Sequence, residues 1–146
     1  MVKAIIVDDE LHAQNAIETI LKSQFSEIEI AGKADTVKSA IELIKSKEPE
    51  LLFLDIDLPD GKGFDILKQL DYKSYKVIFI TAYQEYAVQA IKFSAFDYIL
   101  KPLNPVELIN SVKNALGECS DEQYKLKLDA FLNNFNSTVP GVKKLV

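Results

Sequence analysis

The stretch LLFLDIDLP, residues 51–59, joins a strongly apolar run to two carboxylates. Its first four residues predict a strand that is buried on both faces, as the central strands of parallel sheets are. Asp55 and Asp57 follow that run, and Pro59 lies just beyond them. Burial of a carboxylate is costly unless a partner offsets it, so the position of these acids indicates a site with its own chemistry.

Strand-like and helix-like segments alternate on both sides of this stretch. Short apolar runs predict strands over 3–9, 27–34, 50–57, 76–83 and 96–102. Apolar residues at helical spacing predict helices over 10–25, 36–49, 62–71, 85–95 and 104–117. Either Thr36 or Asp35 is the expected N-cap of the second helix, and Asn104 is the expected N-cap of the fifth. This alternation favours a doubly wound α/β fold, a parallel sheet with helices on both faces. The most apolar strands, the first, third and fourth, belong in its middle.

The pattern changes after Gly117. Residues 120–136 carry one apolar stripe that predicts a further helix, and residues 137–141, STVPG, end it. We therefore expect one domain over 1–117. We interpret 118–146 as a linker helix and the start of a truncated C-terminal effector domain. A terminal helix packed on its own domain is the alternative.

Composition excludes several classes of protein. The 146 residues have a net charge of −5, and all 17 basic residues are lysines, which makes the chain a poor reader of DNA by itself because arginine is the preferred reader of guanine. No apolar run approaches the roughly 18 residues of a membrane span, and the N-terminus does not look like a signal peptide. Cys119 is the only cysteine, which fits a reducing, cytoplasmic location.

Polar residues stand at the carboxyl ends of four predicted strands, the edge where parallel α/β sheets bind ligands. They are Asp8, Asp9, Asp55, Thr81 and Lys101, with Asp57 in the loop beyond the third strand. Clustered carboxylates repel one another unless a cation is present, and Mg²⁺ prefers such oxygen ligands. An aspartate at a strand end beside Mg²⁺ is a possible nucleophile that forms an aspartyl phosphate. A lysine and a threonine can then bind the phosphoryl oxygens.

Four segments in this order resemble the receiver domain of bacterial two-component response regulators. They are IIVDDE, LLFLDIDLPDGKGFDIL, FITAY and DYILKP, and the resemblance spans residues 3–117. The longer string TAYQEYAVQAIKFSAFDYILKPL, residues 81–103, is similar to receivers joined to LytTR-type DNA-binding domains. A flavodoxin-like, five-stranded parallel sheet of order 2-1-3-4-5 with five flanking helices is the expected fold.

The resemblance implies roles for four aspartates. Asp55 is expected to accept a phosphoryl group from a sensor histidine kinase. Asp9 is expected to bind Mg²⁺ directly and Asp8 mainly through water, while Asp57 offers its backbone carbonyl to the metal. Many members of the family carry a neutral polar residue where this chain has Asp57, which leaves open how long the phosphorylated state lasts.

The resemblance also implies a switch. Thr81 is expected to move onto the phosphoryl group, Tyr98 to turn inward behind it, and Lys101 to pair with a phosphoryl oxygen. The Lys101-Pro102 peptide is expected to be cis. The output is expected to be homodimerisation through the fourth helix, fifth strand and fifth helix, controlling a DNA-binding domain absent from this chain. The chain would then be no enzyme beyond its own phosphoryl transfer and autodephosphorylation, and it would need no membrane.

Three alternatives remain open at this point. A phosphatase of the haloacid dehalogenase superfamily also places a DxD motif after an apolar strand, but its motif typically comes first in the chain. A dinucleotide-binding fold lacks its GxGxxG here. A receiver-like interaction module that is never phosphorylated would keep the fold without the chemistry.

His12, the only histidine, is interpreted as a helix surface residue.

Overall fold

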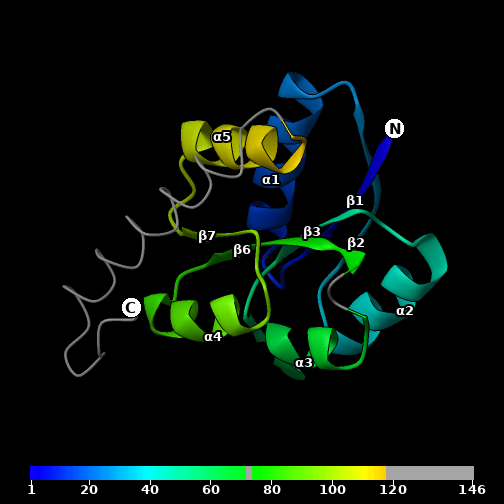
Figure 1. Ribbon diagram of the computed structural model, residues 1–146, viewed down its shortest axis with the longest axis vertical. Helices are drawn as coiled ribbons and strands as arrows, with labels where there is room; N and C mark the ends of the chain where they lie inside the picture. The colour runs from blue at the N-terminus through cyan, green and yellow to red at the C-terminus, as the bar shows by residue number, and fades with distance from the viewer. Residues whose placement is uncertain (72–73, 118–146) are drawn as a thin grey trace.

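The computed structural model describes residues 1–71 and 74–117 and forms a three-layer α/β sandwich (Figure 1). Its strands are β1 (Val2–Val7), β2 (Ile28–Ala34), β3 (Leu51–Leu54), β4 (Asp57–Leu58), β5 (Gly61–Lys62), β6 (Lys76–Thr81) and β7 (Asp97–Leu100). Its helices are α1 (Leu11–Gln24), α2 (Val37–Lys47), α3 (Gly63–Lys68), α4 (Ala87–Lys92) and α5 (Pro105–Ala115), with a 3₁₀ turn η2 (Gln84–Tyr86) before α4. The predicted helix and linker over 118–146 lie outside the described residues.

Five strands form one parallel sheet of order β2-β1-β3-β6-β7. This confirms the doubly wound fold, the expected strand order and the central place of the three most apolar strands. Helices α1 and α5 cover one face of the sheet, and α2, α3 and α4 cover the other (Figure 1).

The central strands are buried on both faces, so successive side chains enter two separate cores. On β3, Leu52 and Leu54 pack toward α2, α3 and α4, whereas Leu51 and Phe53 pack toward α1 and α5. This two-sided burial explains why the run in LLFLDIDLP is apolar throughout rather than alternating. It also holds the end of β3 rigidly at the sheet edge.

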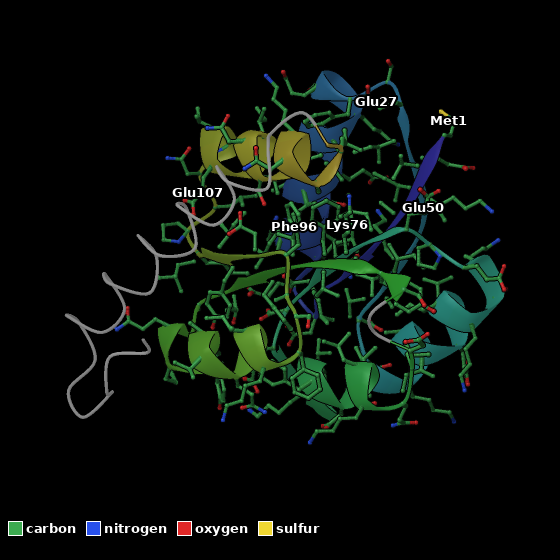
Figure 2. All side chains as sticks on the ribbon, viewed as in Figure 1. Met1, Glu27, Glu50, Lys76, Phe96 and Glu107 are labelled. Atoms are coloured by element: carbon green, nitrogen blue, oxygen red, sulfur yellow. The ribbon has the colours of Figure 1, made fainter. Side chains whose placement is uncertain are left out.

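Helix ends follow the caps that the sequence contains. The Thr36 hydroxyl accepts from the backbone N–H of Ser39 at 3.0 Å, and the Asn104 side chain accepts from the N–H of Val106 at 2.9 Å. At the other end of the fold, Lys76 lies beside the ring of Phe96 and donates to the Ala115 carbonyl, which ties the end of α5 to β6 (Figure 2).

Two segments differ from the expected elements. The loop after β3 contains a short antiparallel hairpin, whose strands β4 and β5 have two residues each. No sequence pattern predicted this hairpin. The helix expected over 85–95 is a 3₁₀ turn followed by the six-residue α4. Within residues 1–71 and 74–117, no helix has both the length and the apolar character that a membrane crossing requires.

Candidate phosphoryl and metal site

Strand register brings the acidic residues together at the carboxyl edge of the sheet. Val7 pairs with Leu54, so Asp8 and Asp55 leave neighbouring strands at the same level. The Asp55 N–H continues the ladder by donating to the Val7 carbonyl at 2.9 Å. The carboxylates of Asp8, Asp9, Glu10 and Asp55 all offer oxygens within 4.8 Å of one another.

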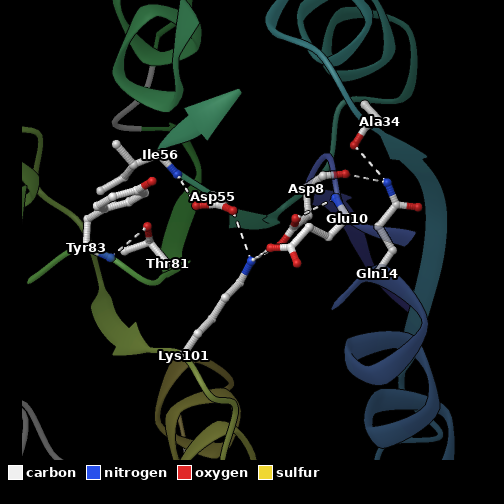
Figure 3. Close-up of polar contacts among 9 residues, drawn as sticks. All are labelled: Asp8, Glu10, Gln14, Ala34, Asp55, Ile56, Thr81, Tyr83 and Lys101. Carbon is white, nitrogen blue, oxygen red and sulfur yellow. Dashed lines mark hydrogen bonds and ion pairs between the residues drawn. The ribbon is translucent and has the colours of Figure 1, made fainter. Parts of the chain in front are cut away.

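Lys101 lies at the centre of this cluster (Figure 3). Its Nζ is 3.0 Å from Asp55 Oδ2, 2.9 Å from Asp8 Oδ2 and 2.9 Å from Glu10 Oε1. Lys101 directly follows β7, and its backbone N–H donates to the Thr81 carbonyl at 2.8 Å. The backbone of β6 therefore fixes the position of the Lys101 backbone. The expected cis peptide between Lys101 and Pro102 is present.

The orientation of both buried carboxylates is set by backbone donors. Asp55 Oδ1 accepts from the N–H of Ile56 at 2.7 Å, which turns Oδ2 toward Lys101. Asp8 Oδ1 accepts from the N–H of Glu10 at 2.9 Å. The Gln14 amide donates to the carbonyls of Asp8 and Ala34, at 2.6 and 3.2 Å, and so locks the end of β1 against β2 (Figure 3).

Burial and neighbouring charges shift the pKa values of these groups. Asp8 is only 1% exposed; burial, with the charge of Asp55 adding to it, raises the pKa of Asp8 above its usual range. Burial alone would lower the pKa of Lys101, but the carboxylates of Glu10, Asp8 and Asp55 outweigh it and raise that pKa. Lys101 in turn lowers the pKa of Glu10. The site therefore pairs two buried carboxylates, Asp8 and Asp55, and the exposed Glu10 with one ammonium.

The residues predicted for the switch lie next to this cluster. Thr81 is fully buried at the end of β6, and its hydroxyl accepts from the N–H of Tyr83 at 3.4 Å (Figure 3). The Tyr98 ring is buried against Phe79, and its hydroxyl donates to the Tyr83 carbonyl. Burial, followed by the charges of Glu85 and Asp55, raises the pKa of the Tyr98 phenol.

Asp57 lies in the hairpin beyond the cluster and is exposed. Its carboxylate pairs with Lys62 at 2.9 Å and accepts from the Tyr83 hydroxyl at 3.3 Å. These partners lower the pKa of Asp57, with Lys62 contributing most. The Asp57 side chain therefore points into a surface network and is not among the clustered carboxylates.

Three contributors to the site escaped the sequence reasoning. Glu10 adjoins Asp8 and Asp9 in the motif but is not among the site residues expected from the sequence. Tyr83 and Lys62 are not among those expected residues either. The acidic run was a usable signal for Glu10, whereas no local pattern links Tyr83 or Lys62 to Asp57.

The oxygen-rich cluster fits a hard divalent cation. Carboxylate oxygens from two neighbouring strand ends converge within 4.8 Å, and the buried carboxylate of Asp8 has a raised pKa, as expected of a group that a cation would stabilise. A metal at this edge could reach oxygens of Asp8, Asp9, Glu10 and Asp55. Lys101 already pairs with three of these four carboxylates, and Asp9 is the exception.

Comparison with known proteins agrees with this geometry. Residues 4–113 match the model of the response regulator receiver domain. The sensory transduction protein LytT of Bacillus anthracis is 39% identical over 117 residues, which cover 77% of this chain and 46% of LytT. The transcriptional regulatory protein BtsR of Escherichia coli is 35% identical over 128 residues, which cover 86% of this chain and 53% of BtsR. The chain thus spans about half the length of these curated relatives.

Solved structures show the same architecture. The response regulatory domain of mrkE from Klebsiella pneumoniae has a TM-score of 0.74 and 31% identity, covering 80% of this chain and 97% of that one. The receiver domain of AraT, a response regulator from Geobacillus stearothermophilus, has a TM-score of 0.74 and 30% identity, covering 84% and 99%. The chain belongs to the response regulator receiver domain family.

Proposed function

We propose that Asp55 accepts a phosphoryl group from a phosphohistidine of a sensor histidine kinase. An Asp55 carboxylate oxygen attacks phosphorus, the P–N bond to the imidazole breaks, and the imidazole nitrogen leaves with the bond's electron pair. Attack by water on phosphorus later breaks the new P–O bond, which releases phosphate and restores the carboxylate. The observation that carries the proposal is the 3.0 Å contact between the Lys101 ammonium and the buried Asp55 Oδ2 within a cluster of four acids.

The surrounding residues have matching roles. Lys101 would neutralise one phosphoryl oxygen, and the buried Thr81 hydroxyl would donate to another. Asp8, Asp9, Asp55 and the backbone carbonyl of Asp57 would hold Mg²⁺, which offsets negative charge on the transferring group when bound. Because Asp55 is held by the Ile56 N–H and Lys101, it needs little reorganisation to react.

Phosphorylation would change the surface formed by α4, β7 and α5. Thr81 and Tyr98 both contact Tyr83, one residue before η2, through the threonine hydroxyl and the tyrosine hydroxyl. A move of Thr81 toward the phosphoryl group would free the Tyr83 N–H and shift the segment that leads into α4. We expect homodimerisation through this surface as the consequence.

The output would be transcription regulation in the cytoplasm by a domain outside the described residues. The similarity of this chain to LytT and BtsR supports this part, since it matches about half of each. We propose residues 1–117 as the receiver and 118–146 as a linker that leads to a DNA-binding domain.

The test is the intact mass of the chain after incubation with acetyl phosphate and Mg²⁺. The wild type should gain one phosphoryl group, and neither Asp55→Asn nor the wild type without Mg²⁺ should gain it. Asp57→Asn is the matched control, because it keeps the backbone carbonyl and should still be labelled. No gain of mass in the wild type would contradict the proposal and favour the receiver-like interaction module that is never phosphorylated. Steady release of phosphate without an adduct would favour the phosphatase alternative.

A further inference from the structure

Asp60 connects the loop beyond the proposed phosphoacceptor to a different helix. It lies at the tip of the β4–β5 hairpin, yet its carboxylate bonds outside that loop. Asp60 Oδ1 accepts from the backbone N–H of Val37 at 2.7 Å, and Oδ2 accepts from the N–H of Lys38 at 3.1 Å. Val37 and Lys38 are the first two residues of α2. Asp60 therefore caps α2 from a position 22 to 23 residues away in the chain.

Helix α2 also has a cap of its own. Thr36 and Ser39 form a reciprocal capping box, in which the Thr36 hydroxyl accepts from the Ser39 N–H at 3.0 Å. The first N–H groups of a helix lack partners within it, and here they are shared between Thr36 and Asp60. Thr36 can stabilise only the helix, whereas Asp60 also fixes the loop to it.

The loop that Asp60 holds is tied at several other points. Leu58 is buried in the core, Lys62 Nζ pairs with Asp57 Oδ1 at 2.9 Å, and the Lys62 N–H donates to Asp65 Oδ2 at 2.8 Å. These contacts secure the base of the hairpin and its side toward α3. The hydrogen bonds of Asp60 to Val37 and Lys38 secure the tip of the hairpin toward α2.

We propose that Asp60 is a positioning residue for the phosphoryl and metal site. By holding the hairpin tip on α2, it keeps the backbone of Asp57 at the place where its carbonyl would meet the metal. The inference rests on the proposed function, because that function gives the Asp57 carbonyl its role. The Asp60 carboxylate bonds to α2 and not to the clustered carboxylates or Lys101, so its effect runs through the loop.

The experiment measures Mg²⁺ affinity directly, by following backbone amide signals in an NMR titration without any phosphoryl donor. Asp60→Ala should weaken Mg²⁺ binding by roughly tenfold, at the low end of what outer partners contribute to metal affinity. Amide hydrogen exchange of residues 57–62 should also rise. Labelling by acetyl phosphate should need correspondingly more Mg²⁺ but should approach the wild-type rate when Mg²⁺ is saturating.

Thr36→Ala is the matched control. It removes a cap from the same helix without touching the loop, so it should lower thermal stability while leaving Mg²⁺ affinity and exchange of residues 57–62 unchanged. If the two variants bind Mg²⁺ alike, Asp60 is only a helix cap and the inference is wrong. Asp60→Asn, which keeps one acceptor oxygen, should fall between the wild type and Asp60→Ala.

The outcomes separate this inference from the proposed function. A wild type that is phosphorylated, with Asp60→Ala binding Mg²⁺ normally, would overturn the inference alone. A wild type that binds Mg²⁺ but takes no phosphoryl group, with Asp60→Ala binding Mg²⁺ weakly, would overturn the proposed function and leave the positioning role. A wild type that binds no Mg²⁺ would overturn both.

Discussion

A β-carbon added at Gly63 would lie 2.4 Å from the backbone carbonyl oxygen of Asp55. The approach is this close because the Gly63 N–H donates to the neighbouring Ile56 carbonyl at 2.7 Å, which folds the loop back over the end of β3. The neighbouring atom is backbone, so it cannot move away as a side chain can. The glycine is therefore part of how the site is built.

Gly63→Ala should displace the backbone of Asp55. We expect a loss of about 1–3 kcal/mol in the free energy of unfolding, the usual cost of forcing an extra group into a packed region, together with a clear loss of labelling by acetyl phosphate. Urea denaturation and intact mass would measure the two effects. Gly32→Ala is the control: its nearest neighbour is the end of the Leu43 side chain, so it should leave labelling intact. Normal labelling of Gly63→Ala would contradict the prediction.

Lys101→Met should make the stability of the protein depend more strongly on Mg²⁺. Without the ammonium, the buried carboxylates of Asp8 and Asp55 lose their shared counter-charge. We expect a loss of roughly 3 kcal/mol in metal-free buffer, as for other broken buried ion pairs. Added Mg²⁺ should recover more stability in Lys101→Met than in the wild type, which thermal unfolding would show. Equal stabilisation of both proteins by Mg²⁺ would contradict this account of the cluster.

The sequence was sufficient to predict the sheet and which polar side chains stand at its carboxyl edge, because both follow from where apolar runs end. Runs such as 51–54 must be central strands, and parallel strands of similar length expose their next residues at one edge. Asp8, Asp55, Thr81 and Lys101 therefore meet, as expected. Their chemical roles remain predictions.

The contacts that the sequence could not predict depend on the tertiary fold. Glu10 reaches Lys101 across 91 residues, and Asp60 reaches Val37 across 23. Each is a surface acid whose local pattern equally fits a solvated turn. The short hairpin of Asp57 and Lys62 has too few residues to show an alternating pattern. Contacts with α2 and α3 hold the hairpin, whereas Glu10 meets Lys101 because β1 and β7 end at the same edge of the sheet.

Ser111→Ala should stabilise the protein. Ser111 lies on α5, is fully buried, and its hydroxyl has no hydrogen-bond partner within the part of the chain that the structure describes. Removing an unsatisfied buried hydroxyl and introducing a better helix former should raise the free energy of unfolding by about 1 kcal/mol. Urea denaturation would measure it. Ser39→Ala should have the opposite effect, because it removes half of the α2 capping box. A destabilised Ser111→Ala would mean that the hydroxyl has a partner.

The contact of Asp60 with α2 should give stability a specific dependence on pH. The N–H groups of Val37, and then of Lys38, lower the pKa of Asp60 in the folded protein. A carboxyl with a lowered folded-state pKa stabilises the fold at pH values above its unfolded pKa, and this contribution disappears as the pH falls through the folded one. The stability difference between wild type and Asp60→Asn should therefore stay constant from about pH 5 to 8 and shrink below about pH 4. Urea denaturation at each pH would measure this difference.

Thr36→Ala is the control, because it removes no ionisable group. The difference in the free energy of unfolding between wild type and Thr36→Ala should remain the same at every pH. A gap between wild type and Asp60→Asn that persists to about pH 2 would mean that the charge of Asp60 contributes nothing.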